Sequence, residues 1–171
     1  MLRLKVIDTA DVPAVLALQS QCYGPEFLES AQAFEAKLSA TRGLHCSYLA
    51  CEGDEALGYV VSLPVQAHSL PALDAVQWSA PAQPDMLYLH DLAVAPAGRA
   101  QRLGHKLVQQ VLQRAQDMGL RRVGLVAVQA SQDFWRRHGF AETSLQTPAL
   151  REKLASFGAQ ARFMERAVVP A

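Results

Sequence analysis

The sequence has few cysteines, no excess of charge of either sign and no long apolar run. Its three cysteines, Cys22, Cys46 and Cys51, are an odd number without the spacing of a disulfide framework. Sixteen basic residues balance sixteen acidic ones, so no overall field favours nucleic acid or an anionic membrane surface. No apolar run approaches the roughly 20 residues of a membrane-spanning helix. We therefore expect neither nucleic acid nor a membrane as a partner, and any anion site must be local.

The amino-terminal stretch and the thiols indicate a compartment. Residues 1–12, MLRLKVIDTADV, carry charges where a signal peptide has its apolar core. Cys46 and Cys51 lie near His45 in an apolar, strand-like run that offers no fourth metal ligand. We expect buried structural thiols, no metal and a cytoplasmic protein. The length of 171 residues predicts one domain over residues 1–171.

Hydrophobic periodicity predicts alternating strands and helices. Helices are expected from a cap at Asp8 or Thr9 to Tyr23, and then over residues 30–40, 102–119 and 132–138, the last capped by Ser131. Strands are expected at residues 2–7, 44–52, 56–65, 88–95, 123–128, 140–147 and 161–169, with a polar connection at 148–158. This order predicts an α/β fold in which one mixed sheet has helices on both faces.

Two features interrupt the periodic pattern. Gly58 lies inside an apolar strand, which indicates a bulge or a close backbone approach. Residues 64–85 contain four prolines and form a long loop. Two interpretations of this loop stay open: His68, Asp74 and Trp78 shape an acceptor site, or the loop is a mobile surface excursion.

Residues 88–119, YLHDLAVAPAGRAQRLGHKLVQQVLQRAQDMG, predict a strand, a small basic loop and a long amphipathic helix. Such a loop directs backbone N–H groups and the positive end of the helix dipole at one spot. We therefore expect a phosphorylated ligand here. The apolar stripe of the helix, with Leu103 and Leu107 among its members, is expected to pack in the core.

Two motifs resemble those of the GCN5-related N-acetyltransferase (GNAT) superfamily. Residues 89–108, LHDLAVAPAGRAQRLGHKLV, resemble its acyl-CoA motif, and residues 134–140, FWRRHGF, resemble its downstream FYxxxGF motif. The element order also matches from Leu2 to Val169. The resemblance implies a sheet of about seven strands that are splayed at the acyl-CoA site, and acetyl-CoA as acyl donor. It implies as cofactor-binding residues Leu92, Ala93, Val94, Arg99, Ala100, Gln101, Arg102, Leu103, Gly104, His105, Ser131, Phe134 and Trp135.

The sequence departs from the family at three positions. Ala100 and Arg102 replace glycines of the phosphate loop, which they can do if both positions are helical or extended. The Arg102 guanidinium then either contacts phosphate or points to solvent. Trp135 stands where the family commonly has a tyrosine beside the leaving sulfur, and an indole cannot deliver its proton. We expect Trp135 to pack against the pantetheine wall, with Phe134 in the core.

The strand before the loop offers the catalytic groups. A period of two places Tyr88, His90, Leu92 and Val94 on one face, and His90 titrates near neutrality. His90 is the predicted base, whereas a histidine satisfied within the sheet is the alternative. Asp91 is expected to face away and to anchor a helix end or loop. The Val94 N–H would stabilise the oxyanion that forms when an amine attacks the thioester. Tyr88 or water would protonate the departing thiolate of CoA.

Together with these residues, the resemblance implies an N-acetyltransferase that moves an acetyl group to a primary amine of a small molecule or peptide in a ternary complex. Two alternatives stay open. One is an acyl-CoA-binding regulatory domain with little transferase activity, and the other is a protein N-terminal or lysine acetyltransferase. The sequence does not name the acceptor amine, and it leaves monomer and homodimer open.

Overall fold

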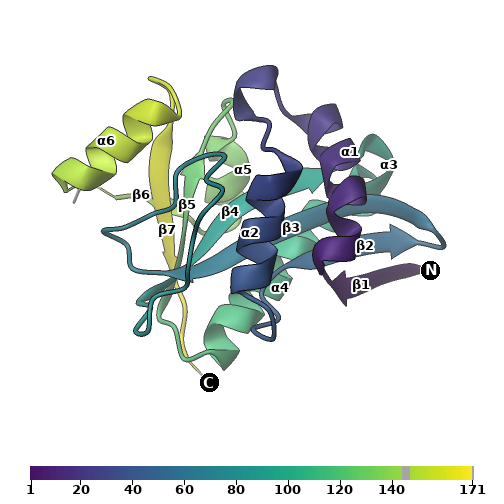
Figure 1. The fold of residues 1–171 in the computed structure, drawn as a ribbon, viewed down its shortest axis with the longest axis horizontal. Coiled ribbons are helices and arrows are strands. Elements are labelled where there is room, and N and C mark those ends of the chain that lie inside the picture. Colours follow the sequence, from purple (N-terminus) through teal and green to yellow (C-terminus); the bar gives the residue numbers. More distant parts are fainter. Residues whose placement is uncertain (144–146, 171) are drawn as a thin grey trace.

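Seven strands form one mixed sheet in the computed structural model, which describes residues 1–143 and 147–170 (Figure 1). The spatial order is β1-β2-β3-β4-β5-β7-β6. Within the described residues, β4 and β5 pair in parallel and every other pair is antiparallel. The strands are β1 Leu2–Val6, β2 Tyr48–Glu52, β3 Glu55–Val65, β4 Met86–Val94, β5 Arg122–Ala127, β6 Ala141–Glu142 and β7 Arg162–Ala167. The predicted mixed sheet is confirmed.

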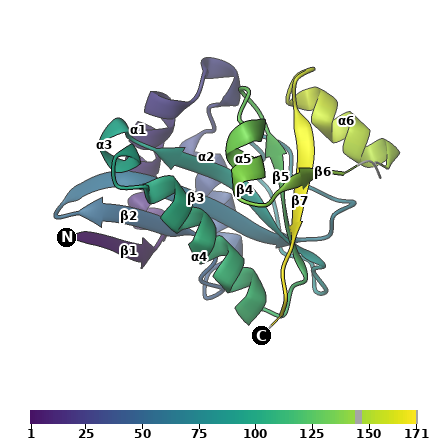
Figure 2. The ribbon, with the colours of Figure 1, turned by 180° about the vertical axis from the view of Figure 1, so that it is seen from behind.

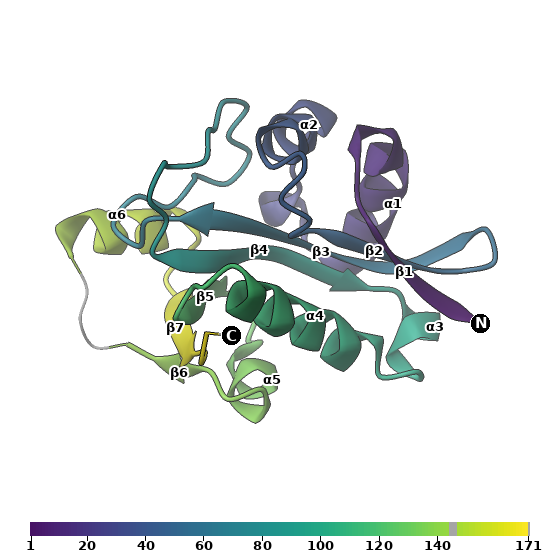
Figure 3. The same cartoon turned by 90° about the horizontal axis from the view of Figure 1, so that it is seen from below.

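Helices cover both faces of the sheet, as Figure 3 shows. Helices α1 (Val12–Cys22) and α2 (Ala31–Ala40) lie on one face, and α4 (Leu103–Asp117) and α5 (Gln132–Arg137) lie on the other (Figure 2). Short helical turns are η1 (Thr9–Asp11), η2 (Pro25–Phe27) and α3 (Pro96–Arg99). The Asp8 side chain caps η1, and the Ser30 hydroxyl caps α2. None of the helices in the described part of the chain is long and apolar enough to cross a membrane.

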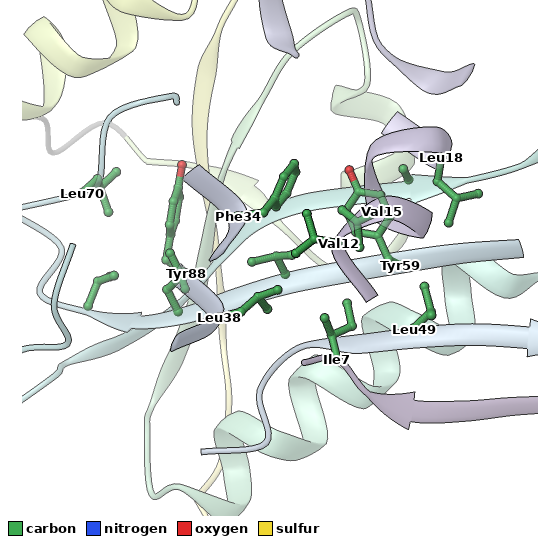
Figure 4. Packing of buried hydrophobic residues seen from close by; sticks show 14 of the residues in the cluster. Ile7, Val12, Val15, Leu18, Phe34, Leu38, Leu49, Tyr59, Leu70 and Tyr88 are labelled. Carbon is green, nitrogen blue, oxygen red and sulfur yellow. The ribbon is translucent and has the colours of Figure 1, made fainter. Parts of the chain in front are cut away.

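The sheet separates two clusters of buried side chains. On the α1/α2 face, Phe34 packs edge-on against Tyr59, with Val15 and Leu18 beside them (Figure 4). On the other face, the apolar stripe of α4 is buried in the second cluster, as predicted from its periodicity. Cys46 and Cys51 are buried, as expected of structural thiols.

Three predicted elements need correction. The connection at 148–158 is not irregular, because Pro148–Ser156 form helix α6, whose first turn is capped by the Thr147 hydroxyl. The apolar positions Leu150 and Leu154 of α6 are buried against the α1/α2-face cluster. The strand predicted at 140–147 is shorter among the described residues: β6 spans Ala141–Glu142, and the Thr143 N–H donates to the Phe163 carbonyl of β7 at 3.3 Å. Residues 144–146 lie outside the described chain. Strand β2 begins at residue 48 rather than 44, because residues 41–44 form a turn.

Gly58 lies where two strands and a helix converge. The β2–β3 register shifts between Ala50 and Cys51, opposite this glycine. A Cβ atom at Gly58 would lie 2.9 Å from the Ala93 carbonyl oxygen and 3.0 Å from a Leu103 methyl group. The predicted bulge and close approach are both present.

Gly58→Ala is therefore expected to lower the free energy of unfolding by about 1–3 kcal/mol, because the Ala93 carbonyl is backbone and cannot move aside. Gly104→Ala is the matched control, since its Cβ would meet the Phe134 ring at 3.4 Å, an ordinary contact. The control should change stability by between zero and a gain of about 1 kcal/mol. Chemical denaturation measures both, and equal effects would contradict the account.

Candidate active site

Strands β4 and β5 pair only over a short length and then part. Their register pairs are Leu87 with Val123 and Tyr88 with Gly124. Beyond Tyr88, β4 continues beside β3 as far as Val94, and Figure 2 shows β4 and β5 running apart. A cavity of about 670 Å³ lies at the parting and is lined by both strands, the start of α4 and α5.

The end of β4 presents backbone N–H groups to this cavity. The Ala95 N–H donates to the Leu57 carbonyl of β3 at 2.8 Å. Because successive residues of a strand point their N–H groups to opposite edges, Leu92 and Val94 direct theirs away from β3. On the same edge, the Tyr23 hydroxyl donates a hydrogen bond of 2.7 Å to the Leu92 carbonyl. The edge can accept a strand-like ligand.

Basic side chains collect at the start of α4. The first N–H groups of the helix lack intrahelical partners, and the helix dipole adds positive potential there. His105 and His138 face each other, with Nδ1 of the first 3.4 Å from Nε2 of the second. The cationic or titratable side chains that line this end of the cavity are Arg99, Arg102, His105, Arg137 and His138. A protein of zero net charge thus has a local site suited to phosphate.

Ala100 and Arg102, which stand where the family has glycine, differ in backbone conformation. Ala100 is helical, with φ at −61°. Arg102 has φ at 55°, in the left-handed region, so the condition of a helical or extended backbone is met at Ala100 and not at Arg102. A side chain at such an angle costs about 1 kcal/mol.

We expect Arg102→Gly to be more stable than Arg102→Ala by about 1 kcal/mol, because only glycine relieves the left-handed strain. Both variants remove the guanidinium and should weaken CoA binding equally, by about 3- to 10-fold for an exposed charged contact. Thermal unfolding and calorimetric titration with CoA test the pair. Wild-type affinity in both variants would show that Arg102 faces solvent.

A bulge in β4 changes the predicted faces of the strand. Val61 is opposite Asp91 and Ser62 is opposite Leu89, so His90 is an extra residue in β4. His90 and Asp91 consequently both lie on the α1/α2 face, where Glu29 and Tyr59 bind them. Leu92 and Val94 pack on the α4 face. The prediction that His90 shares a face with Leu92 and Val94 is wrong, as is the outward placement of Asp91.

His90 is bound by a carboxylate from the turn between α1 and α2. Its Nε2 lies 2.6 Å from Oε1 of Glu29, and both side chains are almost fully buried. The Nδ1 atom of His90 is buried and has no hydrogen-bond partner among the described residues. His90 also lines the cavity. A buried nitrogen without a partner is the kind of group that a substrate or water completes.

Asp91 is a second titratable group at the cavity. The Tyr59 hydroxyl donates to its Oδ2 at 2.5 Å. Burial raises the pKa of Asp91 to about 6, although hydrogen bonds from Tyr59 and Tyr23 and the charge of His90 act in the opposite direction. The cavity is therefore acidic at this end and basic at the α4 end.

Asp91→Asn should stabilise the protein at neutral pH. A carboxyl whose pKa is raised by folding weakens the folded state above that pKa, and the penalty vanishes where both states are protonated. The stability difference between variant and wild type should be near zero at pH 3, where both states are protonated, and reach about 1–3 kcal/mol above pH 6. Denaturation across this pH range measures it, with the exposed Asp133→Asn as control. A pH-independent difference would contradict the buried carboxylate.

Most of the predicted site residues meet at the cavity. His90 lines it, as do ten of the thirteen predicted cofactor-binding residues: Leu92, Ala93, Val94, Arg99, Arg102, Gly104, His105, Ser131, Phe134 and Trp135. Ala100, Gln101 and Leu103 are not among the lining residues. Leu103 is instead fully buried under the sheet, because it belongs to the apolar stripe of α4.

Two aromatic predictions change. Tyr88 is buried on the α1/α2 face and does not line the cavity, and burial raises the pKa of its hydroxyl, so it is not placed to protonate a thiolate. Trp135 is the core residue, with its ring 5.6 Å from Phe140, while Phe134 is only partly buried. The prediction of Phe134 as the core residue is therefore wrong, whereas packing of Trp135 against pantetheine stays a prediction, because both rings line the cavity.

The long loop is tied to the site rather than free. Asp74 Oδ1 accepts the Ser30 N–H at 2.7 Å, and the Asp74 N–H donates to Glu29 at 2.8 Å. Trp78 packs partly buried against the α1/α2-face cluster. His68 lies elsewhere, in a separate cavity of about 400 Å³ beside α6.

Sequence reasoning missed the polar residues of the α1–α2 segment. Tyr23 and Cys22 line the cavity, and Glu29 binds His90. Lys37 is fully buried and pairs with Glu29. Lys37 had a visible signal, because it occupies an apolar position of its helix between Phe34 and Leu38.

The topology and the parted strands are those of the acetyltransferase class. A profile of the acetyltransferase (GNAT) family matches residues 12–140. The chain belongs to this family. No curated protein matches the sequence significantly.

Solved structures share the fold at low identity. The loading GNATL domain of CurA from Lyngbya majuscula is 15% identical with a TM-score of 0.77, and the match covers 98% of both chains. The ribosomal-protein-S18-alanine N-acetyltransferase from Escherichia coli is 16% identical with a TM-score of 0.68, over 100% of this chain and 96% of that one. The PaiA N-acetyltransferase from Thermoplasma acidophilum, solved with coenzyme A, is 11% identical with a TM-score of 0.69, over 98% and 99%.

Proposed function

We propose that the protein is an acetyl-CoA-dependent N-acetyltransferase that acts on a primary amine of a small molecule or peptide by direct attack in a ternary complex. One observation carries the proposal. One cavity joins the basic start of α4, the N–H groups of Leu92 and Val94 at the edge of β4, and a buried histidine whose Nδ1 has no hydrogen-bond partner among the described residues. These three parts match the phosphates, the pantetheine amides and the reacting end of an acyl-CoA.

Acetyl-CoA would be held mainly by backbone groups. The pyrophosphate lies against the first N–H groups of α4, with Arg99 and Arg102 adding charge-assisted contacts. The pantetheine arm lies along the free edge of β4 beside Leu92 and Val94, as an added strand does, and the Val94 N–H is left for the thioester oxygen. The PaiA enzyme was solved with coenzyme A, which supports this assignment of the cavity.

The acidic end of the cavity suits an ammonium acceptor. An alkyl amine has a pKa near 10.4, so the acceptor arrives charged and must lose a proton before it attacks. The Asp91 carboxylate attracts the cation, and His90 accepts the proton at Nδ1. The amine then attacks the thioester carbonyl, the Val94 N–H stabilises the oxyanion, and an amide forms as the carbon–sulfur bond breaks.

The leaving thiolate receives its proton from water. Trp135 cannot supply one, since an indole N–H is not acidic at neutral pH. A thiol pKa near 8.5 makes the thiolate a fair leaving group without a positioned acid.

The buried Trp135 is also the observation that favours the second candidate, an acyl-CoA-binding domain with little activity. A protein N-terminal or lysine acetyltransferase, a cytoplasmic location and a homodimer stay predictions.

His90→Ala tests the proposal. The purified protein, acetyl-CoA and a panel of amines should release free thiol, and the variant should lower kcat by about 10² to 10⁴, the usual contribution of a positioned base. CoA affinity should stay within about twofold, because His90 does not lie at the basic end of the cavity.

His45→Ala is the matched control, since His45 is exposed and lies outside the cavity. It should retain wild-type turnover. CoA binding without acceptor-dependent thiol release across the whole panel would overturn the transferase assignment and favour the binding domain.

A further inference from the structure

A buried ion pair between Glu29 and Lys37 contacts His90. Glu29 uses its Oε1 atom for His90 and its Oε2 atom for Lys37, whose Nζ lies 3.2 Å away. The side chains of Lys37 and Glu29 are 0% and 2% exposed. The same Oε2 atom accepts the N–H of Asp74 from the long loop at 2.8 Å. The carboxylate therefore has two donors on one oxygen and the histidine on the other.

These contacts decide the charge of Glu29. Burial raises the pKa of Glu29, whereas His90, the Lys37 ammonium and the Asp74 amide lower it. The two groups that face Oε2, the Lys37 ammonium and the Asp74 amide, are both donors whatever the charge of His90, so they stabilise the ionised form. The group is thus an ionised carboxylate, which can only accept hydrogen bonds. The 2.6 Å contact consequently requires His90 Nε2 to be the donor.

We propose that Glu29 is a positioning residue that sets the tautomer of His90, with Lys37 and the Asp74 amide holding its second oxygen. The proton of a neutral imidazole then resides on Nε2, and the lone pair resides on Nδ1. Nδ1 is the ring nitrogen that has no partner among the described residues. The inference rests on the proposed function, in which His90 accepts a proton from the amine.

The alternative is that the ion pair only attaches the long loop to α2. Lys37 Nζ also donates to the Ala75 carbonyl at 3.1 Å, which serves that purpose. Attachment alone would not require a contact with His90, and it makes no demand on the position of the histidine proton. The tautomer therefore distinguishes the two roles.

Glu29→Gln changes the tautomer without changing the shape of the side chain. Lys37 and the Asp74 amide are both donors, so the carbonyl oxygen of the new amide must occupy the Oε2 position. Its NH₂ group then faces His90 and forces Nε2 to accept, which moves the ring proton to Nδ1. We expect kcat to fall by about 10² to 10⁴, as it does when a triad carboxylate becomes an amide, with KM for acetyl-CoA unchanged.

Nitrogen-15 NMR of the histidine rings reads the tautomer directly. The wild-type protein should show the proton of neutral His90 on Nε2, and the variant should show it on Nδ1. Glu165→Gln is the matched control, because Glu165 also forms an ion pair, with Arg122, but on the surface. The control should leave both the tautomer of His90 and kcat as in the wild type.

In Glu29→Gln the buried Lys37 ammonium has no carboxylate beside it, and a second variant removes this charge. Glu29→Gln with Lys37→Met keeps the Asp74 amide as the donor that orients the new side chain, so the same change of tautomer and kcat is expected. A wild-type proton on Nδ1, or an unchanged tautomer in both variants, would overturn the inference even if His90→Ala is inactive. A changed tautomer with full activity in both variants would instead overturn the assignment of His90 as the base.

Discussion

The separation of β4 from β5 after Tyr88 is the constraint on which the site depends. If the two parallel strands stayed paired, their N–H and C=O groups would hydrogen-bond to each other and none would be left for a ligand. Because pairing stops at Tyr88 and Gly124, β4 keeps a free edge at Leu92 and Val94 that an extended ligand can use. The start of α4 lies at the same opening. One ligand that carries both a phosphate and an extended chain can therefore bind at α4 and along β4 at the same time.

The bulge at His90 completes this arrangement. A regular strand would send His90 and Asp91 to opposite faces, and one of them would be lost to the site. The extra residue turns both toward α1 and α2. The Val94 N–H remains on the free edge of the same strand. The proposed base, the Asp91 carboxylate and the proposed oxyanion donor therefore all lie within five consecutive residues of β4.

Local patterns predicted the fold better than they predicted the contacts of the site. The mixed sheet, the stripe of α4 and the Gly58 bulge follow from periodicity and turn chemistry. Ten of the thirteen residues predicted to bind acyl-CoA line the cavity. The bulge at His90 does not follow from local patterns, because it arises from register with β3, which strand periodicity does not report. The buried pair of Glu29 and Lys37 likewise joins segments that are distant from β4, and only the misplaced lysine of α2 signalled it. Helix α6 was missed because only two of its residues, Leu150 and Leu154, are large and apolar, and these two are buried only through the tertiary fold.

The most direct test of this account is the crystal structure of the protein with acetyl-CoA. The account predicts the pantetheine arm along the free edge of β4 and the thioester oxygen about 2.7–3.1 Å from the Val94 nitrogen, the distance of an oxyanion donor. It also predicts the acetyl group on the side of the cavity that His90 lines. A cofactor bound with its thioester outside the parted strands would contradict the central claim, whatever the activity of the protein.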